Sequence, residues 1–119
     1  MTALSRKQKG NLGEAFAAKY LEGKGYRIID RNFYAKGGEL DIIAKTNDGV
    51  WVFVEVKSYK SNSPIHPLEA ITPLKQRRII RTAQVYIATR IYKEVASRFD
   101  CVVIQDGEVT HHLENCISL

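Results

Sequence analysis

The chain has few of the residues that mark exported, membrane-bound or zinc-binding proteins. Its two cysteines, Cys101 and Cys116, have no CxxC partner and no histidines at zinc-ligand spacing. No stretch approaches the roughly 18 uninterrupted apolar residues that a membrane span needs, and no apolar signal core follows the basic first ten residues. We therefore expect a cytoplasmic protein with reduced thiols and no membrane contact.

Histidine is also scarce, and two of the three histidines are adjacent. A strand would turn His111 and His112 to opposite faces, so they could not chelate one ion together. We expect both at a solvated strand end.

Charge is unevenly distributed along a chain whose net charge is +5. Residues 1–36 and 57–98 are basic, whereas residues 37–56 and 99–119 are acidic. Basic blocks fit either a solubilising surface or a polyanionic ligand. With 119 residues and 45% hydrophobic content, residues 1–119 are expected to form a single domain.

Periodicity and turn residues predict an α/β fold. A helix is expected over residues 5–24, with an apolar face that includes Phe16 and Leu21. A second helix is expected from Thr72-Pro73 to about Thr89, because threonine is a good cap and proline suits the first helical position. Strands are expected at 26–34, 40–45, 50–57, 99–105 and 108–113. The result is a single mixed sheet with flanking helices in αβββαββ order, a meander followed by a helical crossover.

The predicted hairpin of residues 40–57 brings two acids together. Its second strand has valine at every even position from 50 to 56, a core face, which leaves Trp51, Phe53, Glu55 and Lys57 on the other face. A three-residue loop at residues 47–49 would pair Thr46 with Val50 and set Asp41 across from Glu55. A two-residue loop would instead oppose the valine face to the polar one.

Two like charges at facing strand positions need compensation. A shared proton, or a salt bridge to Lys57 or Lys45, is one solution. A hard divalent cation bound between Asp41 and Glu55 is the other. In the latter case Lys57, on the same face, could orient an attacking water or neutralise a phosphate.

Glu14 is a further candidate. It lies at the border of the buried helical strip formed with Ala17, Ala18 and Leu21. Its spacing from Asn11 also fits a capping box. If the helix starts earlier, the carboxylate would face the sheet and favour a cation, and Gly13 would allow close approach of helix and sheet.

These residues together resemble the YraN-like family of small bacterial proteins, over about residues 9–117. The resemblance rests on Gly13-Glu14, Gly38-Glu39-Leu40-Asp41, Val52-Phe53-Val54-Glu55-Val56-Lys57, Lys75 with Arg78, and Arg98-Phe99-Asp100. The family is similar to PD-(D/E)xK nucleases, the restriction-endonuclease-like superfamily that includes archaeal Holliday-junction resolvases.

The resemblance implies a restriction-endonuclease-like core and Mg²⁺-dependent phosphodiester hydrolysis, with Mn²⁺ able to substitute. Asp41, Glu55 and the carbonyl of Val56 would bind the metal, Lys57 would be the catalytic lysine, and Glu14 an outer ligand. One position departs from the family pattern, because Tyr59 stands where a basic residue is common and Lys60 follows it. Contacts with substrate near that loop are therefore open.

Basic residues crowd the second predicted helix at spacings where like charges repel, which a polyanion would relieve. The expected nucleic-acid-binding residues, on this helix and around the acidic site, are Arg6, Lys7, Lys9, Lys60, Lys75, Arg77, Arg78 and Arg81. A solvated helix face is the alternative. No base-reading motif is present, so we expect structure-selective or nonspecific binding.

The leading hypothesis is a Mg²⁺-dependent endonuclease acting on DNA, including branched DNA. The alternatives are a non-catalytic nucleic-acid-binding module that retains the nuclease fold, and a protein-interaction module. Homodimerisation would suit an enzyme that cuts two strands, and Tyr92, Ile117 and Leu119 are candidate exposed apolar positions for it.

Overall fold

The computed structural model describes residues 6–60 and 71–117, with side chains from Leu12 onward. The elements follow one another as α1 (Arg6–Gly23), β1 (Arg27–Ala35), β2 (Gly38–Lys45), β3 (Trp51–Tyr59), α2 (Pro73–Tyr86), the short π-helix η2 (Ile87–Ile91), β4 (Ser97–Gln105) and β5 (Glu108–Leu113). The predicted α/β class and the αβββαββ order are confirmed.

The strands form one five-stranded sheet in the order β1-β2-β3-β4-β5. Strands β3 and β4 are parallel, and every other neighbouring pair is antiparallel. The parallel pair is the one whose connection contains α2, since parallel neighbours need a long crossover. The predicted meander and helical crossover are therefore confirmed.

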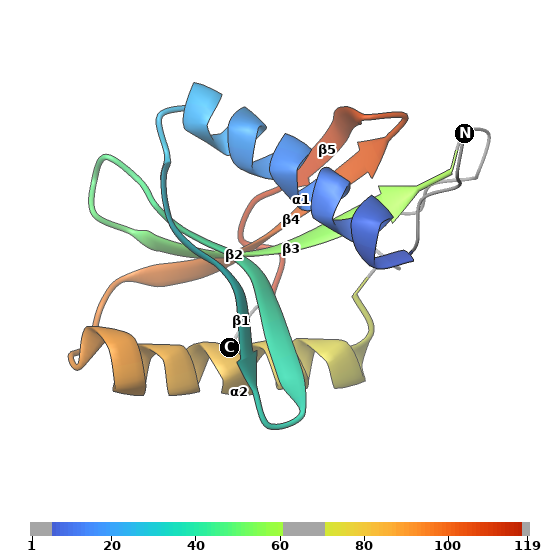
Figure 1. The fold of residues 1–119 in the computed structure, drawn as a ribbon. Coiled ribbons are helices and arrows are strands. Elements are labelled where there is room, and N and C mark those ends of the chain that lie inside the picture. The colour runs from blue at the N-terminus through green and yellow to red at the C-terminus, as the bar shows by residue number, and fades with distance from the viewer. Residues whose placement is uncertain (1–5, 61–70, 118–119) are drawn as a thin grey trace.

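Helices cover both faces of the sheet, α1 on one side and α2 on the other (Figure 1). On the α1 side, Ala17 and Leu21 pack against the valines of β3. On the α2 side, Ile79 and Tyr86 pack against Phe53. The prediction of a single core face on β3 was wrong, because this central strand is covered from both sides and Phe53 is only 1% exposed.

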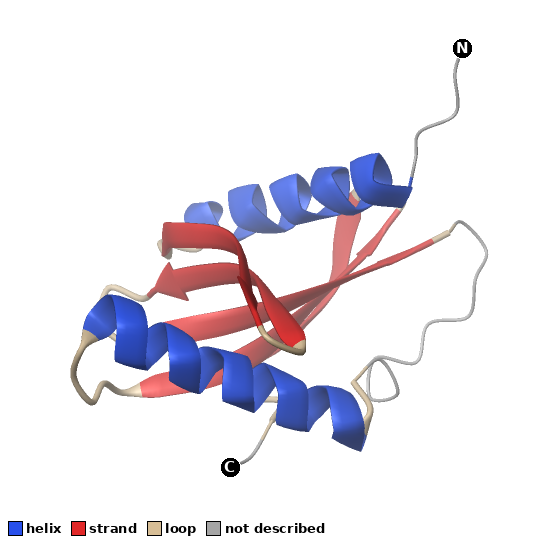
Figure 2. Cartoon of the chain, turned by 60° about the horizontal axis from the view of Figure 1, so that its bottom comes forward, coloured by secondary structure: helices blue, strands red, loops and turns tan. Residues whose placement is uncertain are grey.

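Strand β2 leaves its partner β3 part-way along its length. Its pairing with β3 runs from Lys45 opposite Trp51 to Ile42 opposite Val54, whereas its pairing with β1 continues to Gly38. The turn end of the β1–β2 hairpin thus curls over α2 (Figure 2). Leu40 consequently packs on the α2 side while Ile42 packs on the α1 side, so the single face predicted for them was wrong.

Residues next to its two ends determine where α2 begins and where the helical turn after it stops. The hydroxyl oxygen of Thr72 accepts a hydrogen bond from the amide of Lys75 at 3.2 Å, and Pro73 opens the helix, as predicted. The predicted continuation toward Thr89 is the π-helical turn η2, which ends at Tyr92 in a left-handed conformation with φ of 67°.

Candidate active site

Asp41 lies where β2 separates from β3, and its side chain bridges the gap. The amide of Val56 donates a 2.8 Å hydrogen bond to Oδ2 of Asp41. In β3, the Val50 carbonyl accepts from Thr46, so the even-numbered residues direct their backbone groups toward β2. The Asp41 carboxylate therefore replaces a missing backbone partner, and the Val56 carbonyl points to the same side.

Glu55 and Lys57 reach the same place from β3. The hairpin has the predicted three-residue loop, with Thr46 and Val50 hydrogen-bonded, and the register predicted from it is confirmed. Asp41, Glu55 and Lys57 line one pocket of about 310 Å³. The two carboxylates, 6% and 8% exposed as residues, are thus buried side by side in a single site.

Burial and crowding shift the titration of this site. Burial first, and then the negative charge of Glu55, raise the pKa of Asp41 to about 8. The pKa of Lys57 is lowered by burial and by the neighbouring Lys75 ammonium. Both shifts increase the neutral forms of the two groups near neutral pH.

Lys75 is the member of the site whose place the sequence did not predict. It was expected among the nucleic-acid-binding residues, yet its Nζ lies 2.6 Å from Oε1 of Glu55. The Nζ of Lys57 is 3.8 Å from the same oxygen. Burial lowers the pKa of Lys75, but its hydrogen bonds to Glu55 and Lys57 and the negative charges of Glu55 and Asp41 together raise it. Only its position in the first turn after the Thr72 cap could have indicated this contact.

Glu14 enters the pocket from α1, as predicted. Burial, more than any neighbouring charge, raises its pKa. Its Oε1 has no hydrogen-bond partner among the described residues, and the guanidinium of Arg31 lies 3.7 Å away. A Cβ on Gly13 would clash with the hydroxyl of Ser58, so glycine permits the close approach of helix and sheet.

The donors in the pocket fit a hard divalent cation. Asp41 and Glu55 offer carboxylate oxygens, Val56 offers a carbonyl, and Glu14 contributes a buried oxygen without a hydrogen bond. Within residues 6–60 and 71–117, no three His, Cys, Asp or Glu side chains form a metal-holding group. The fit is therefore to two carboxylates and a carbonyl, with Glu14 further out.

Known proteins resemble this chain along most of its length. The model of the family described as Uncharacterised protein family UPF0102 matches residues 13–104. The chain belongs to this family. A UPF0102 protein of Trichlorobacter lovleyi is 42% identical over 92% of this chain and 90% of its own length. One from Prosthecochloris aestuarii is 47% identical over 80% and 74%. The resemblance to the YraN-like family is thereby confirmed.

Two solved structures share a distant likeness with this UPF0102 member. The structure of an EndoMS–dsDNA2 complex has a TM-score of 0.45 and 16% identity, covering 87% of this chain and 39% of the other. The structure of Pyrococcus furiosus SfsA in complex with Ca²⁺ has a TM-score of 0.36 and 14% identity, covering 96% and 65%. The chain thus spans less than two thirds of either protein.

Four of the other basic residues predicted to bind nucleic acid are exposed in this UPF0102 member. Arg77, Arg78 and Arg81 are exposed on α2, and Lys60 is exposed at the end of β3. Arg78 also lines a neighbouring pocket of about 380 Å³ together with Glu55 and Lys75. The side chains of Arg6, Lys7 and Lys9 lie outside the described part of the chain.

A second buried charge cluster surrounds Asp100, which is 1% exposed. Its carboxylate accepts hydrogen bonds from Nε of Arg98 at 3.1 Å and from the amide of Asn115 at 3.0 Å, and it contacts Nε2 of His112 at 2.8 Å. The prediction of a solvated His112 was wrong, because this ring packs under α1 against Tyr20. His111, on the opposite side, is exposed as expected.

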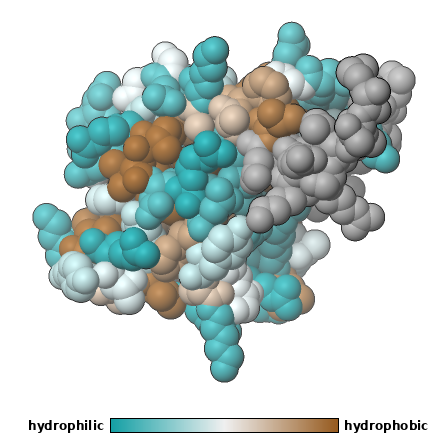
Figure 3. Space-filling view, viewed as in Figure 1, coloured by the Kyte–Doolittle hydropathy of each residue, from teal (hydrophilic) through white to brown (hydrophobic). Residues whose placement is uncertain are grey.

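Of the apolar residues predicted to be exposed, only some are exposed in the structure. Tyr92 is 80% exposed, but Ile117 is 2% exposed because it packs into the α2-side core. Leu119 lies outside the described residues. Phe16, expected on the buried face of α1, is 42% exposed. On the face shown in Figure 3, hydrophobic residues form small groups separated by hydrophilic ones.

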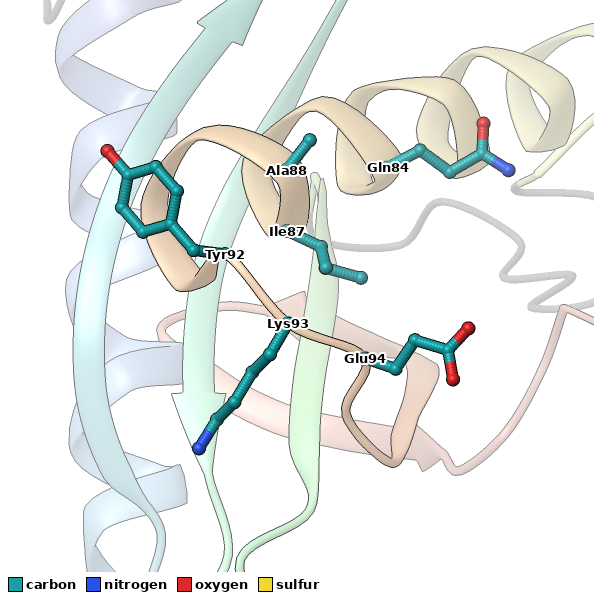
Figure 4. Close-up of a pocket in the computed structure, with 6 residues that line it drawn as sticks. All are labelled: Gln84, Ile87, Ala88, Tyr92, Lys93 and Glu94. Carbon is teal, nitrogen blue, oxygen red and sulfur yellow. The ribbon is translucent and has the colours of Figure 1, made fainter.

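Tyr92 borders a pocket of about 400 Å³ where η2 ends, at the other end of the second helix from Lys75. The side chains that line it spread around this turn (Figure 4). Over residues 6–60 and 71–117, the protein has no helix with the length and apolar character needed to cross a membrane.

Proposed function

We propose that this protein is a metal-dependent endonuclease that hydrolyses phosphodiester bonds in DNA, with a PD-(D/E)xK-type site. One observation carries the proposal: Asp41 and Glu55 share a buried pocket with Lys57, where burial and then the negative charge of Glu55 raise the pKa of Asp41 to about 8. A bound cation would stabilise both ionised carboxylates, which otherwise repel each other.

Each residue has a distinct role in this proposal. Asp41, Glu55 and the Val56 carbonyl would hold Mg²⁺, or Mn²⁺ in its place. The metal supplies a Lewis acid that polarises the phosphoryl oxygen and stabilises the leaving group. Lys57 orients the attacking water from the same pocket. Glu14 holds water at the edge of the site.

The exposed basic residues would attract the substrate. Arg77, Arg78 and Arg81 project from α2, whose first turn also carries Lys75 into the pocket. Contacts with phosphates give affinity without reading base sequence. DNA with branches or other irregular backbone shape is therefore the expected substrate.

Cleavage assays test the proposal directly. Branched, single-stranded and duplex DNA are incubated with the protein and increasing Mg²⁺ or Mn²⁺. We expect metal-dependent cleavage that Asp41→Asn, Glu55→Gln or Lys57→Met reduces by at least about 100-fold, as expected when a key transition-state contact is lost. The exposed carboxylate variants Asp48→Asn and Glu108→Gln are matched controls and should cleave normally. Cleavage that survives all three site substitutions would reject this site.

One contact favours a second candidate, a nucleic-acid-binding module with little turnover. The 2.6 Å ion pair of Lys75 with Glu55 already compensates one of the two acids without any metal. This module would bind DNA without cleaving it. Its binding would depend on Arg77 and Arg81, and replacing either should lower the slope of log affinity against log salt by about 0.9 per lost phosphate contact. Metal-dependent cleavage would exclude it.

A further inference from the structure

A pocket beside the acidic site has no role in the proposed hydrolysis. It has a volume of about 670 Å³ and lies between α1, the end of β3 and the turn between β4 and β5. Its lining includes the apolar side chains of Leu12, Phe16 and Ile104 and the ring of Tyr59. Its polar lining residues are Ser58, Lys60 and Asp106, so it carries charges of both signs. Pockets of this volume commonly hold small ligands or parts of larger ones.

Phe16 presents an aromatic ring to this pocket. The ring is held against the β4–β5 turn, because a Cβ on Gly107 would lie 3.4 Å from its Cζ atom. Even so, Phe16 is 42% exposed, and Leu12, one helical turn earlier, is 45% exposed. A flat apolar ligand stacked on Phe16 would cover both side chains.

The pocket adjoins the acidic site. Ser58 lines both, and Gly13, which lines this pocket, directly precedes Glu14 of the acidic site. Lys60 adds a positive charge at the same edge. A nucleic-acid chain whose phosphate lies at Asp41 and Glu55 would therefore bring a neighbouring nucleotide to Phe16.

We propose that this pocket binds an unpaired nucleobase, stacked on Phe16, next to the phosphodiester that is cut. The proposal rests on the proposed function for the identity of its ligand. Aromatic side chains bind bases by stacking, which tolerates any sequence because every base has a π-face. A base inside a duplex is already stacked and paired, so the pocket favours DNA with an unpaired nucleotide beside the cleavage position.

Binding without metal tests the proposal separately from cleavage. Two labelled DNA duplexes are compared in EDTA: one has a single unpaired thymidine, and the other has an abasic residue at that position. We expect the wild-type protein to bind the first about 5-fold to 100-fold more tightly, the range that base stacking on one aromatic ring provides. Phe16→Ala should abolish the preference, and Phe16→Trp should retain it.

Controls exclude trivial causes. Tyr92→Ala removes another exposed aromatic ring, at the far end of α2, and should leave the preference intact. Thermal unfolding shows whether Phe16→Ala remains folded, and Phe16→Trp provides an aromatic variant if it does not. Equal binding of both DNAs by the wild-type protein, or a preference that Phe16→Ala retains, would overturn the proposal. If the preference is present but no DNA is cut with Mg²⁺, hydrolysis fails while the base pocket stands.

Discussion

The Nζ of Lys75 lies 2.6 Å from Oε1 of Glu55, and this contact joins α2 to the central strand at the acidic site. The ammonium group lies closer to that oxygen than Lys57, whose Nζ is 3.8 Å away. A divalent cation on the same oxygen would repel the Lys75 ammonium. In the proposed site, Lys75 and the metal would therefore compete for Glu55, and the released lysine would be able to meet a phosphate.

Removing this competitor should strengthen metal binding. We expect Lys75→Met to raise Mn²⁺ affinity about fivefold or more, equivalent to about 1 kcal/mol of relieved repulsion near a protein surface. Isothermal titration with Mn²⁺ measures the change without any DNA. Arg77→Met removes the same charge from an exposed position on the same helix and is the matched control. Equal affinities for the two variants would show that Lys75 does not compete with the metal.

The raised pKa of Asp41 predicts a pH-dependent cost to stability. Its folded pKa, about 8, is above the ordinary 3.8, so the folded protein holds this proton more tightly than the unfolded chain. The contribution of this bound proton to the free energy of unfolding is complete below pH 3.8 and is lost as pH rises through about 8. Asp41→Asn keeps an acceptor for the Val56 amide but cannot ionise.

We therefore expect Asp41→Asn to gain stability relative to the wild-type protein between pH 5 and pH 9, by at least about 1 kcal/mol. Urea unfolding without divalent metal, at several pH values, measures the difference. Asp48→Asn, in the exposed hairpin turn, should show almost none. If the difference in unfolding free energy between the wild-type protein and Asp41→Asn stays constant with pH, the pKa of Asp41 is not raised by burial beside Glu55.

Gly13 and Ser58 should behave as a coupled pair. A methyl group at residue 13 would collide with the Ser58 hydroxyl, although alanine generally favours a helix by up to about 1 kcal/mol over glycine. Gly13→Ala should thus destabilise the wild-type protein but stabilise a Ser58→Ala background. Gly23→Ala, at the other end of α1 with nothing within 4 Å, is the control. Additive effects in denaturant unfolding would show that helix and strand do not meet there.

The buried carboxylate of Asp100 should be essential for the stability of the charge cluster that it forms with Arg98 and His112. Burial alone would raise its pKa, but hydrogen bonds from His112 and Arg98 outweigh burial and lower it. Asp100→Asn removes the buried anion beside Arg98 and leaves it, among the described residues, only the exposed carboxylate of Glu114 at 3.9 Å, so we expect a loss of about 3 kcal/mol in urea unfolding. Because the folded pKa is lowered, this stability is present above pH 3.8 and is lost as pH falls below it. A loss that persists unchanged at acidic pH would contradict this account.

Local patterns in the sequence were sufficient to predict the helices and strands and to bring Asp41 close to Glu55. Alternation in residues 40–45 and 50–57 and the turn at residues 47–49 determine the register, since a slip by one residue would turn every side chain to the other face. That register brings Asp41 to Glu55. The Thr72 cap and the position of Glu14 on α1 are also encoded within single elements.

Contacts between distant elements were decided by the tertiary structure. His112 is buried because β5 passes under α1, and Ile117 because the chain after β5 returns to the α2-side core. Phe16 is 42% exposed although its ring lies beside the Gly107 turn. Helical and strand periodicity show which face of an element is apolar, but not how far the facing element extends.

The sequence by itself determined that two carboxylates and a lysine come together at one hairpin, because the register of adjacent strands follows from a short loop and an alternating pattern. Only the tertiary structure decided that Lys75 neutralises Glu55 and that an aromatic pocket adjoins the site. Both depend on where helices dock on the sheet, which is set by packing over the whole molecule, such as the close approach of Gly38 to Thr82.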